Sequence, residues 1–123
     1  MDQLYETIVK SISDKLISYI CKKYTTKIKD CQIFMYQSDL YETTISGDYL
    51  RSHNAILLNY KFIHNSPKRI CGTLINLFSQ AVVHKLGMES PSKKNTVEYN
   101  KLLLSVRSDL INSLGVTSAE VIP

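Results

Sequence analysis

Apolar residues between Ala55 and Ile63 alternate with a period of two. This period is typical of a β-strand with one buried face. We expect the strand to end at His64. The residues predicted to share its buried face are Ile56, Leu58, Tyr60 and Phe62.

A helix is predicted directly after this strand. Ser66 stands where a helix N-cap is wanted, and Pro67 suits the first helical position because its missing N–H is not needed there. Gly87 suits the left-handed residue that ends a helix. Between them, apolar residues recur at three- and four-residue spacing, as in an amphipathic helix with a buried stripe: Ile70, Leu74, Leu77, Phe78, Ala81, Val82 and Leu86.

The first part of the chain, from Asp2 to about Tyr24, also has helical periodicity. We expect its apolar face to be buried in the core, because most amphipathic helices of small domains bury their stripe. The alternative is that this face meets a partner. Its apolar residues are Leu4, Ile8, Val9, Ile12, Leu16, Ile17 and Ile20.

Two short strands are predicted between this helix and the strong strand. Residues 31–36 form an apolar run, and residues 40–45 are rich in Tyr, Thr and Ile, which favour strands. Residues 37–39 are predicted to form the turn between them. Residues 46–48, Ser-Gly-Asp, have the composition of a second turn.

Residues 96–114 fit two patterns. A helical stripe that Gly115 would close predicts a helix over about Lys101 to Leu114, and local signals favour it. Shorter alternating runs leave open a strand near Val97 to Ser105.

Together these elements predict a single α+β domain over residues 1–123. Its expected architecture is a small antiparallel sheet of three to four strands, packed by two or three amphipathic helices. A stretch with Pro91 and several Ser and Lys residues predicts an exposed loop at 88–95.

Composition limits the classes of function. No apolar run approaches the ~20 residues that cross a bilayer, and the N-terminus does not resemble a secretory signal, so we expect a protein used inside a cell, with no membrane partner. Three widely spaced cysteines without a CxxC pair indicate neither a disulfide framework nor a zinc site. We therefore expect no metal and no cofactor.

Charge is distributed unevenly, although the net charge is only +4. Residues 31–60 carry one arginine against three acidic residues, whereas residues 61–94 carry six basic residues against one acidic residue. This difference suggests contact between copies, head to tail in a ring, with a scattered solvated surface as the alternative. The candidate interface residues are Tyr41, Asp48, Arg51, Lys68, Arg69, Lys93 and Lys94.

Catalytic patterns are weak. The histidines His53, His64 and His84 show no metal-ligand spacing. Cys71, in the first turn of the central helix beside Lys68, could have a lowered thiol pKa, but no base is identified and a buried structural cysteine is the commoner case. We expect no enzyme, and nucleic-acid binding is the weaker use of the basic residues and tyrosines because no reader motif is present.

The order of elements resembles that of bacteriophage tail-completion, or tail-terminator, proteins. The resemblance covers residues 2–87 and lies in the strand with Gln32, Ile33 and Phe34, the strand ending near Asn59, and the helix after Pro67. It implies an α+β structural protein that forms a ring at the end of a tail tube, with strand edges touching neighbouring copies. It also implies a further strand after the second helix and, for location, the virion tail.

The expected function is therefore structural or assembly work through protein–protein contact, as a homo-oligomeric ring with neighbouring assembly proteins. The alternative is a soluble binding module, such as a toxin-neutralising or secretion-chaperone protein, working in a one-to-one or dimeric complex.

Overall fold

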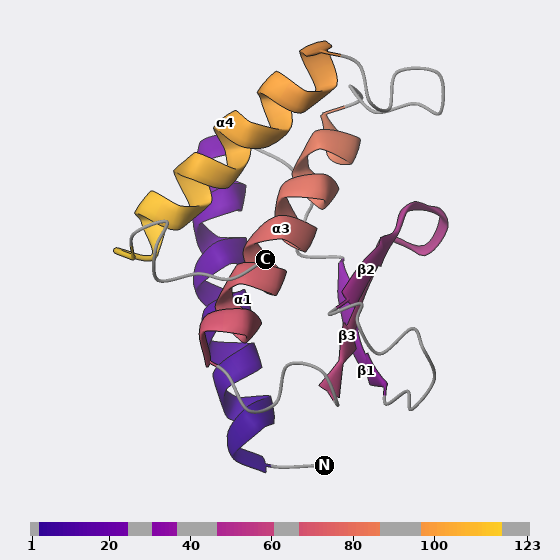
Figure 1. The fold of residues 1–123 in the computed structure, drawn as a ribbon, viewed down its shortest axis with the longest axis vertical. Helices are drawn as coiled ribbons and strands as arrows, with labels where there is room; N and C mark the ends of the chain where they lie inside the picture. Colours follow the sequence, from indigo (N-terminus) through magenta and orange to yellow (C-terminus); the bar gives the residue numbers. More distant parts are fainter. Residues whose placement is uncertain (1–2, 25–30, 37–46, 61–66, 87–96, 117–123) are drawn as a thin grey trace.

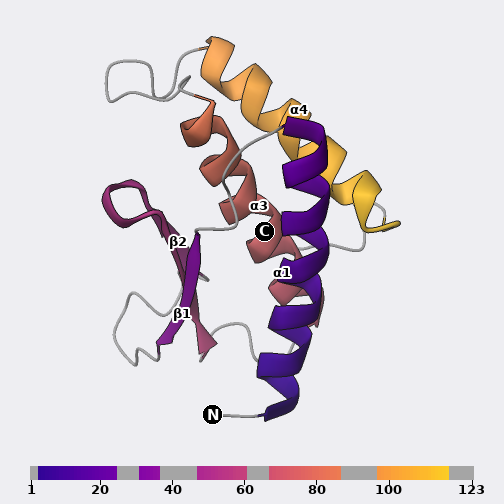
Figure 2. The same cartoon turned by 180° about the vertical axis from the view of Figure 1, so that it is seen from behind.

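The computed structural model describes residues 3–24, 31–36, 47–60, 67–86 and 97–116. Three helices lie on one side of the molecule and a three-stranded sheet on the other (Figures 1 and 2). This confirms the predicted α+β class. In chain order the elements are α1 (Gln3–Tyr24), β1 (Gln32–Tyr36), β2 (Gly47–Leu50), the short 3-10 helix η3 (Arg51–His53), β3 (Ala55–Asn59), α3 (Pro67–Lys85) and α4 (Val97–Ser113).

Helix α3 is the centre of the structure. It begins at Pro67, as predicted, and contacts α1, α4, β2 and β3. Its predicted stripe is buried from Ile70 to Val82, but Ile75 and Val83, which lie off that stripe, are also buried at 0% exposure. A helix with neighbours on several sides has more than one buried face, which a single-stripe pattern does not reveal.

Helix α1 buries its apolar side against α3, as predicted. Val9, Leu16 and Ile20 are at most 4% exposed, and Ile8, Ile12 and Ile17 pack partly buried around them. At the C-terminal end of α1, the Tyr24 hydroxyl donates a 2.6 Å hydrogen bond to Asp109 Oδ2 of α4. Lys23 Nζ lies 3.2 Å from the same oxygen. Burial and this hydrogen bond raise the pKa of Tyr24, and the same bond lowers the pKa of Asp109.

The sheet has the order β1-β3-β2 and is mixed, so the prediction of an antiparallel sheet is wrong for one of its two pairings. β2 pairs antiparallel with β3, whereas β1 pairs parallel with β3, with Ile33 beside Ile56. Residues 37–54, including β2, connect β1 to β3. A connection of that length allows the crossover that a parallel pair needs, and local alternation does not encode strand direction.

The two faces of the sheet differ. Ile56 and Leu58 of β3 and Tyr49 of β2 are at most 6% exposed and belong to the core with α1 and α3, as the alternation predicted for β3. We call this the inner face. The opposite, outer face carries side chains that alternate with these along the strands: Gln32, Phe34, Tyr36, Asp48, Leu50, Ala55, Leu57 and Asn59.

The predicted turn at residues 46–48 is wrong for its last two residues, because Gly47 and Asp48 begin β2. Gly47 instead allows β2 to lie close to the backbone of β3 and to α3. A Cβ atom there would lie 2.5 Å from the Leu57 carbonyl oxygen and 3.0 Å from Leu77 Cδ1 of α3. The chain reverses after β2 through η3 and Asn54, whose φ of 47° is left-handed.

Helix α4 settles the ambiguity of the last third of the chain. The segment from Val97 to Ser113 is helical, so the helix prediction is confirmed and the alternative strand is wrong. Tyr99, Val106, Leu110 and Ile111 form its buried stripe. The stripe packs on α3, where Arg107 Nε donates a 2.8 Å hydrogen bond to Asn76 Oδ1. The further strand implied by the tail-terminator resemblance is therefore replaced by a helix.

Several predicted features lie outside the described residues: the strand at 40–45, the turn at 37–39, Phe62 and the residues around it, Ser66, Gly87 and the loop at 88–95. Within the described part of the chain, every helix is too short or too polar to cross a lipid bilayer.

Candidate protein-contact surface

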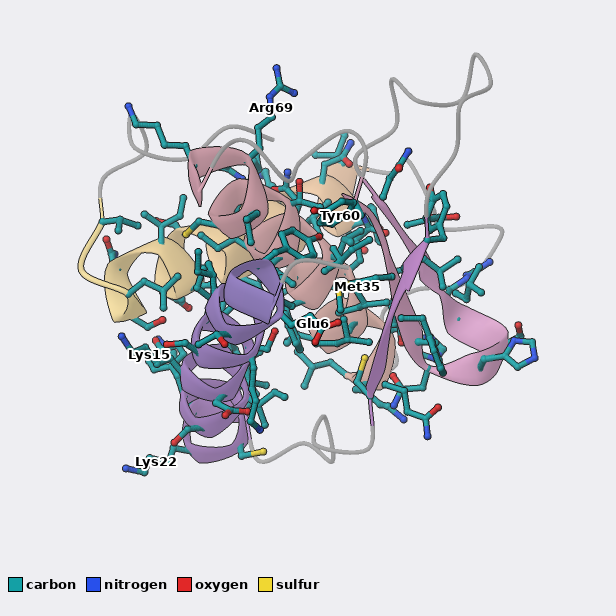
Figure 3. All side chains as sticks on the ribbon, turned by 90° about the horizontal axis from the view of Figure 1, so that it is seen from below. Glu6, Lys15, Lys22, Met35, Tyr60 and Arg69 are labelled. Atoms are coloured by element: carbon teal, nitrogen blue, oxygen red, sulfur yellow. The ribbon has the colours of Figure 1, made fainter. Side chains whose placement is uncertain are left out.

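A groove of about 230 Å³ runs between α1 and β1. Val9 and Ile17 of α1 and Ile33 and Met35 of β1 supply its apolar lining. Charged residues of α1 line the rest of it: Glu6, Lys10 and Asp14. Figure 3 shows Glu6 and Met35 side by side, one from each element.

Ser13 lies in this groove and is the polar residue on the buried side of α1. It is 3% exposed, and its hydroxyl has no hydrogen-bond partner within the described residues. A buried hydroxyl without a partner costs about 1–3 kcal/mol of folding free energy. The wall of the groove therefore holds a buried hydroxyl whose hydrogen-bonding capacity is unused within the described residues.

The groove continues into the free edge of β1. The Gln32 N–H donates to the Asn54 carbonyl at 3.2 Å, so Gln32 directs its backbone groups toward β3. Successive residues of a strand direct these groups to opposite sides. The N–H and C=O groups of Ile33 and Met35 therefore point away from β3, to the side where no other described strand pairs with β1.

The edge strand β1 lacks the features that usually protect an edge. Its sequence, Gln-Ile-Phe-Met-Tyr, holds no charge and no proline, although Lys, Pro and inward-pointing charges are the common guards. Phe34, at the middle of β1, is 51% exposed on the outer face. Within the described residues, the edge thus combines backbone groups that no strand pairs with an exposed aromatic side chain.

Comparisons with known proteins do not extend this description. No family model, curated protein or solved structure matches this chain.

The predicted interface residues lie apart in the structure. Asp48 and Arg51 lie on β2 and η3, near the C-terminal end of α3, where the Tyr49 ring lies 6.1 Å from that of His84. Lys68 and Arg69 lie at the opposite end of α3, about 22 Å away by the rise of a helix. Tyr41, Lys93 and Lys94 lie outside the described residues.

The structure places Cys31 and Cys71 in buried positions. Cys71 is 9% exposed. Burial raises the pKa of the Cys31 thiol to about 11, with the nearby Lys85 charge opposing this, so Cys31 is a thiol at neutral pH. The described residues include no group of three His, Cys, Asp or Glu side chains able to hold a metal ion.

A second groove, of about 470 Å³, lies between α1 and the end of α4. It is lined by Lys15 and Lys22, which Figure 3 shows on the side of α1 away from the sheet. Of the buried polar atoms that lack a partner in the described residues, none belongs to a residue of this groove. The groove beside β1 is therefore the better candidate for a contact.

Sequence reasoning identified the strand at residues 31–36 but not the role of its edge. One signal was available: Ser13 falls four residues after Val9 and three before Leu16, on the apolar stripe. A polar residue on a buried stripe indicates a special contact. The edge itself was not visible, because the place of a strand in the sheet order depends on tertiary structure.

Proposed function

We propose that this protein is a structural or assembly protein that acts by protein–protein contact, and that the contact is a strand of another chain added to the edge of β1. The observation that carries this proposal is the uncharged edge of β1 beside the α1/β1 groove, an edge with which no other described strand pairs. Strand addition uses main-chain hydrogen bonds for affinity and pockets for alternate side chains for specificity.

The edge of β1 and the groove beside it offer both main-chain hydrogen bonds and side-chain pockets. The outward N–H and C=O groups of Ile33 and Met35 give the main-chain bonds. Inward-facing side chains of the added strand continue the row of Ile33 and Met35 and lie along the groove.

The narrower form of the proposal is the ring of a phage tail terminator. Its support is the order of elements from α1 to α3, and strand edges are the contacts that the resemblance implies. Helix α4 stands where the tail-terminator pattern has a strand. The resemblance therefore supports the ring only through the elements from α1 to α3. A native mass of many copies would support the ring.

The runner-up is a soluble binding module in a one-to-one complex. The α1/β1 groove favours it, because a concave apolar site with a buried polar group also suits one inserted segment of a single partner. A stable one-to-one complex of a protein that is otherwise monomeric would favour this form.

Amide hydrogen exchange along β1 tests strand addition directly. In an isolated chain, the amides of Gln32, Phe34 and Tyr36 exchange slowly because they face β3, whereas those of Ile33 and Met35 exchange fast. We expect Ile33 and Met35 to become protected at high protein concentration or with a strand-forming synthetic peptide of alternating valine and threonine between lysines.

The control is the same peptide with the amides of one edge methylated, which leaves that edge unable to donate hydrogen bonds. It should protect Ile33 and Met35 less. Fast exchange of both amides with the unmethylated peptide and at every protein concentration would contradict the proposed function.

A further inference from the structure

We infer that β1 is a two-fold contact between two copies of this chain, in which β1 pairs antiparallel with the β1 strand of the second copy about an axis at Phe34. This inference rests on the proposed function and names the occupant of the edge. It joins two three-stranded sheets into one continuous sheet.

The backbone of β1 fits this symmetry. Ile33 and Met35 carry the outward N–H and C=O groups and lie one residue to either side of Phe34. When two such strands run antiparallel about Phe34, Ile33 of each copy stands opposite Met35 of the other. Each of these pairs then exchanges both of its N–H···O bonds, so the outward groups of Ile33 and Met35 are all used.

The side chain at the axis is also self-complementary. In this register Phe34 of one copy lies opposite Phe34 of the other, at a non-hydrogen-bonded position. At such positions the Cα atoms approach to about 4.5 Å and the side chains are closest. Both rings project from the outer face, where Phe34 is 51% exposed. Aromatic pairs across neighbouring strands stabilise sheets, and each ring would shield the other from water.

Electrostatics select β1 over the other edge of the sheet. β1 carries no charge, so its pairing with itself brings no like charges together. β2 carries the exposed Asp48, and a two-fold contact through β2 would place two such carboxylates close together, which destabilises pairing. On α1, beside the axis, Lys10 and Asp14 form a 3.5 Å ion pair, so the rim of the groove carries charges of both signs.

The symmetry also leaves the helices clear of the outer face. A two-fold axis perpendicular to the sheet keeps both copies' helices on the same side, because α1, α3 and α4 all lie on the inner side of the sheet, with α4 packed on α3 (Figures 1 and 2). The outer faces then form one surface with the two Phe34 rings at its centre. Closed two-fold dimers are the commonest oligomers of soluble proteins.

Disulfide trapping tests the register. In a Cys21→Ser background, Phe34→Cys places two thiols across the axis at a Cα separation compatible with a disulfide bond. We expect mild oxidation to convert most of the protein to a covalent dimer, visible on a non-reducing gel. The matched control is Leu104→Cys, at a 63% exposed position on α4, which should stay monomeric on the gel. Equal dimer yields from both variants, or none from Phe34→Cys, would overturn the inference.

Light scattering on a sizing column gives the second readout. We expect the unmodified protein to be a dimer and Phe34→Lys to be a monomer, with roughly tenfold or greater weakening, because a buried aromatic contact becomes a pair of like charges. Leu104→Lys makes the same change at an exposed site and should remain dimeric. A dimer or ring that Phe34→Lys leaves intact would show that another surface is used, and the inference would fail.

The two proposals fail differently. If the protein is monomeric at every concentration while the synthetic peptide still protects the Ile33 and Met35 amides, the edge serves another chain: this inference is lost and the proposed function stands. If neither a second copy nor the peptide protects these amides, both are lost.

Discussion

The inner and outer faces of the sheet are built from adjacent residues of the same strands, yet they have different roles. On the inner face, Ile56 and Leu58 are fully buried under the helices. On the outer face, Phe34 is 51% exposed and Leu57 is half-buried, although both are as apolar as their neighbours. The inner face stabilises the fold, whereas the outer face leaves Phe34 exposed.

Two consecutive leucines give the largest test of this difference. Leu58→Ala removes a fully buried side chain and should lower the free energy of unfolding by about 2–5 kcal/mol, since a cavity remains. Leu57→Ala is the matched control on the outer face and should cost under ~1.5 kcal/mol. Urea denaturation of both variants measures the difference, and equal losses would mean that the faces are equally packed.

Gly47 tests how tightly the inner face meets α3. In Gly47→Ala the new Cβ would meet the Leu57 carbonyl oxygen at 2.5 Å and Leu77 Cδ1 at 3.0 Å. Backbone cannot retreat as a flexible side chain can, so we expect a loss of about 1–3 kcal/mol in the free energy of unfolding. Asp48→Asn, one residue away on the exposed outer face, should change stability by less than ~0.5 kcal/mol. A neutral Gly47→Ala would show that β2 can shift away from α3.

The helical side also has a polar connection that depends on pH. Hydrogen bonds from Tyr24 and from Lys23 hold the pKa of Asp109 below its usual value. An unfolded Asp has a pKa near ~3.9, so the connection stabilises the fold above that pH and its contribution is lost as pH falls through the lower folded pKa.

Asp109→Asn should therefore destabilise the protein at neutral pH and much less in acid. We expect a difference of about 1 kcal/mol at pH 7, reduced from the range for charged hydrogen bonds because the Asp109 side chain is 28% exposed. The measurement is urea denaturation of both proteins at neutral pH and below the folded pKa of Asp109. A difference that does not change with pH would contradict a contribution from the carboxylate charge.

Ser13 gives the smallest effect, with the opposite sign. Ser13→Ala removes a buried hydroxyl that lacks a described partner and adds a better helix former, so the free energy of unfolding should rise by up to about 1 kcal/mol. A variant that is less stable than the unmodified protein would mean that Ser13 has an internal partner.

The sequence predicted those parts of the fold that local patterns determine. The start of α3 followed from Pro67, the inner face of β3 from the alternation of Ile56 and Leu58, and α1 from its stripe. The parallel pairing of β1 was missed, because hydrophobic alternation is the same in parallel and antiparallel strands. Gly47 was assigned to a turn, because glycine signals a turn and a close backbone approach equally.

The candidate site was less predictable than the fold. Residues such as Arg51 and Lys68 were chosen by charge, and the structure places them at opposite ends of α3. The surface that emerged instead has little charge at its centre and depends on which strand lies at the edge. Edge position is a property of the whole sheet, so no single segment of the sequence encodes it.

The mixed topology of the sheet has a consequence for the order of folding. β2 reaches β3 across the residues from Arg51 to Asn54, whereas β1 must wait for a connection over residues 37–54. Closing the longer loop costs about 1 kcal/mol more in chain entropy, which favours formation of the β2–β3 hairpin before β1 joins it. Until β1 arrives, the empty side of β3 accepts β1 from any copy, which makes strand exchange between chains the expected route of misassembly at high concentration.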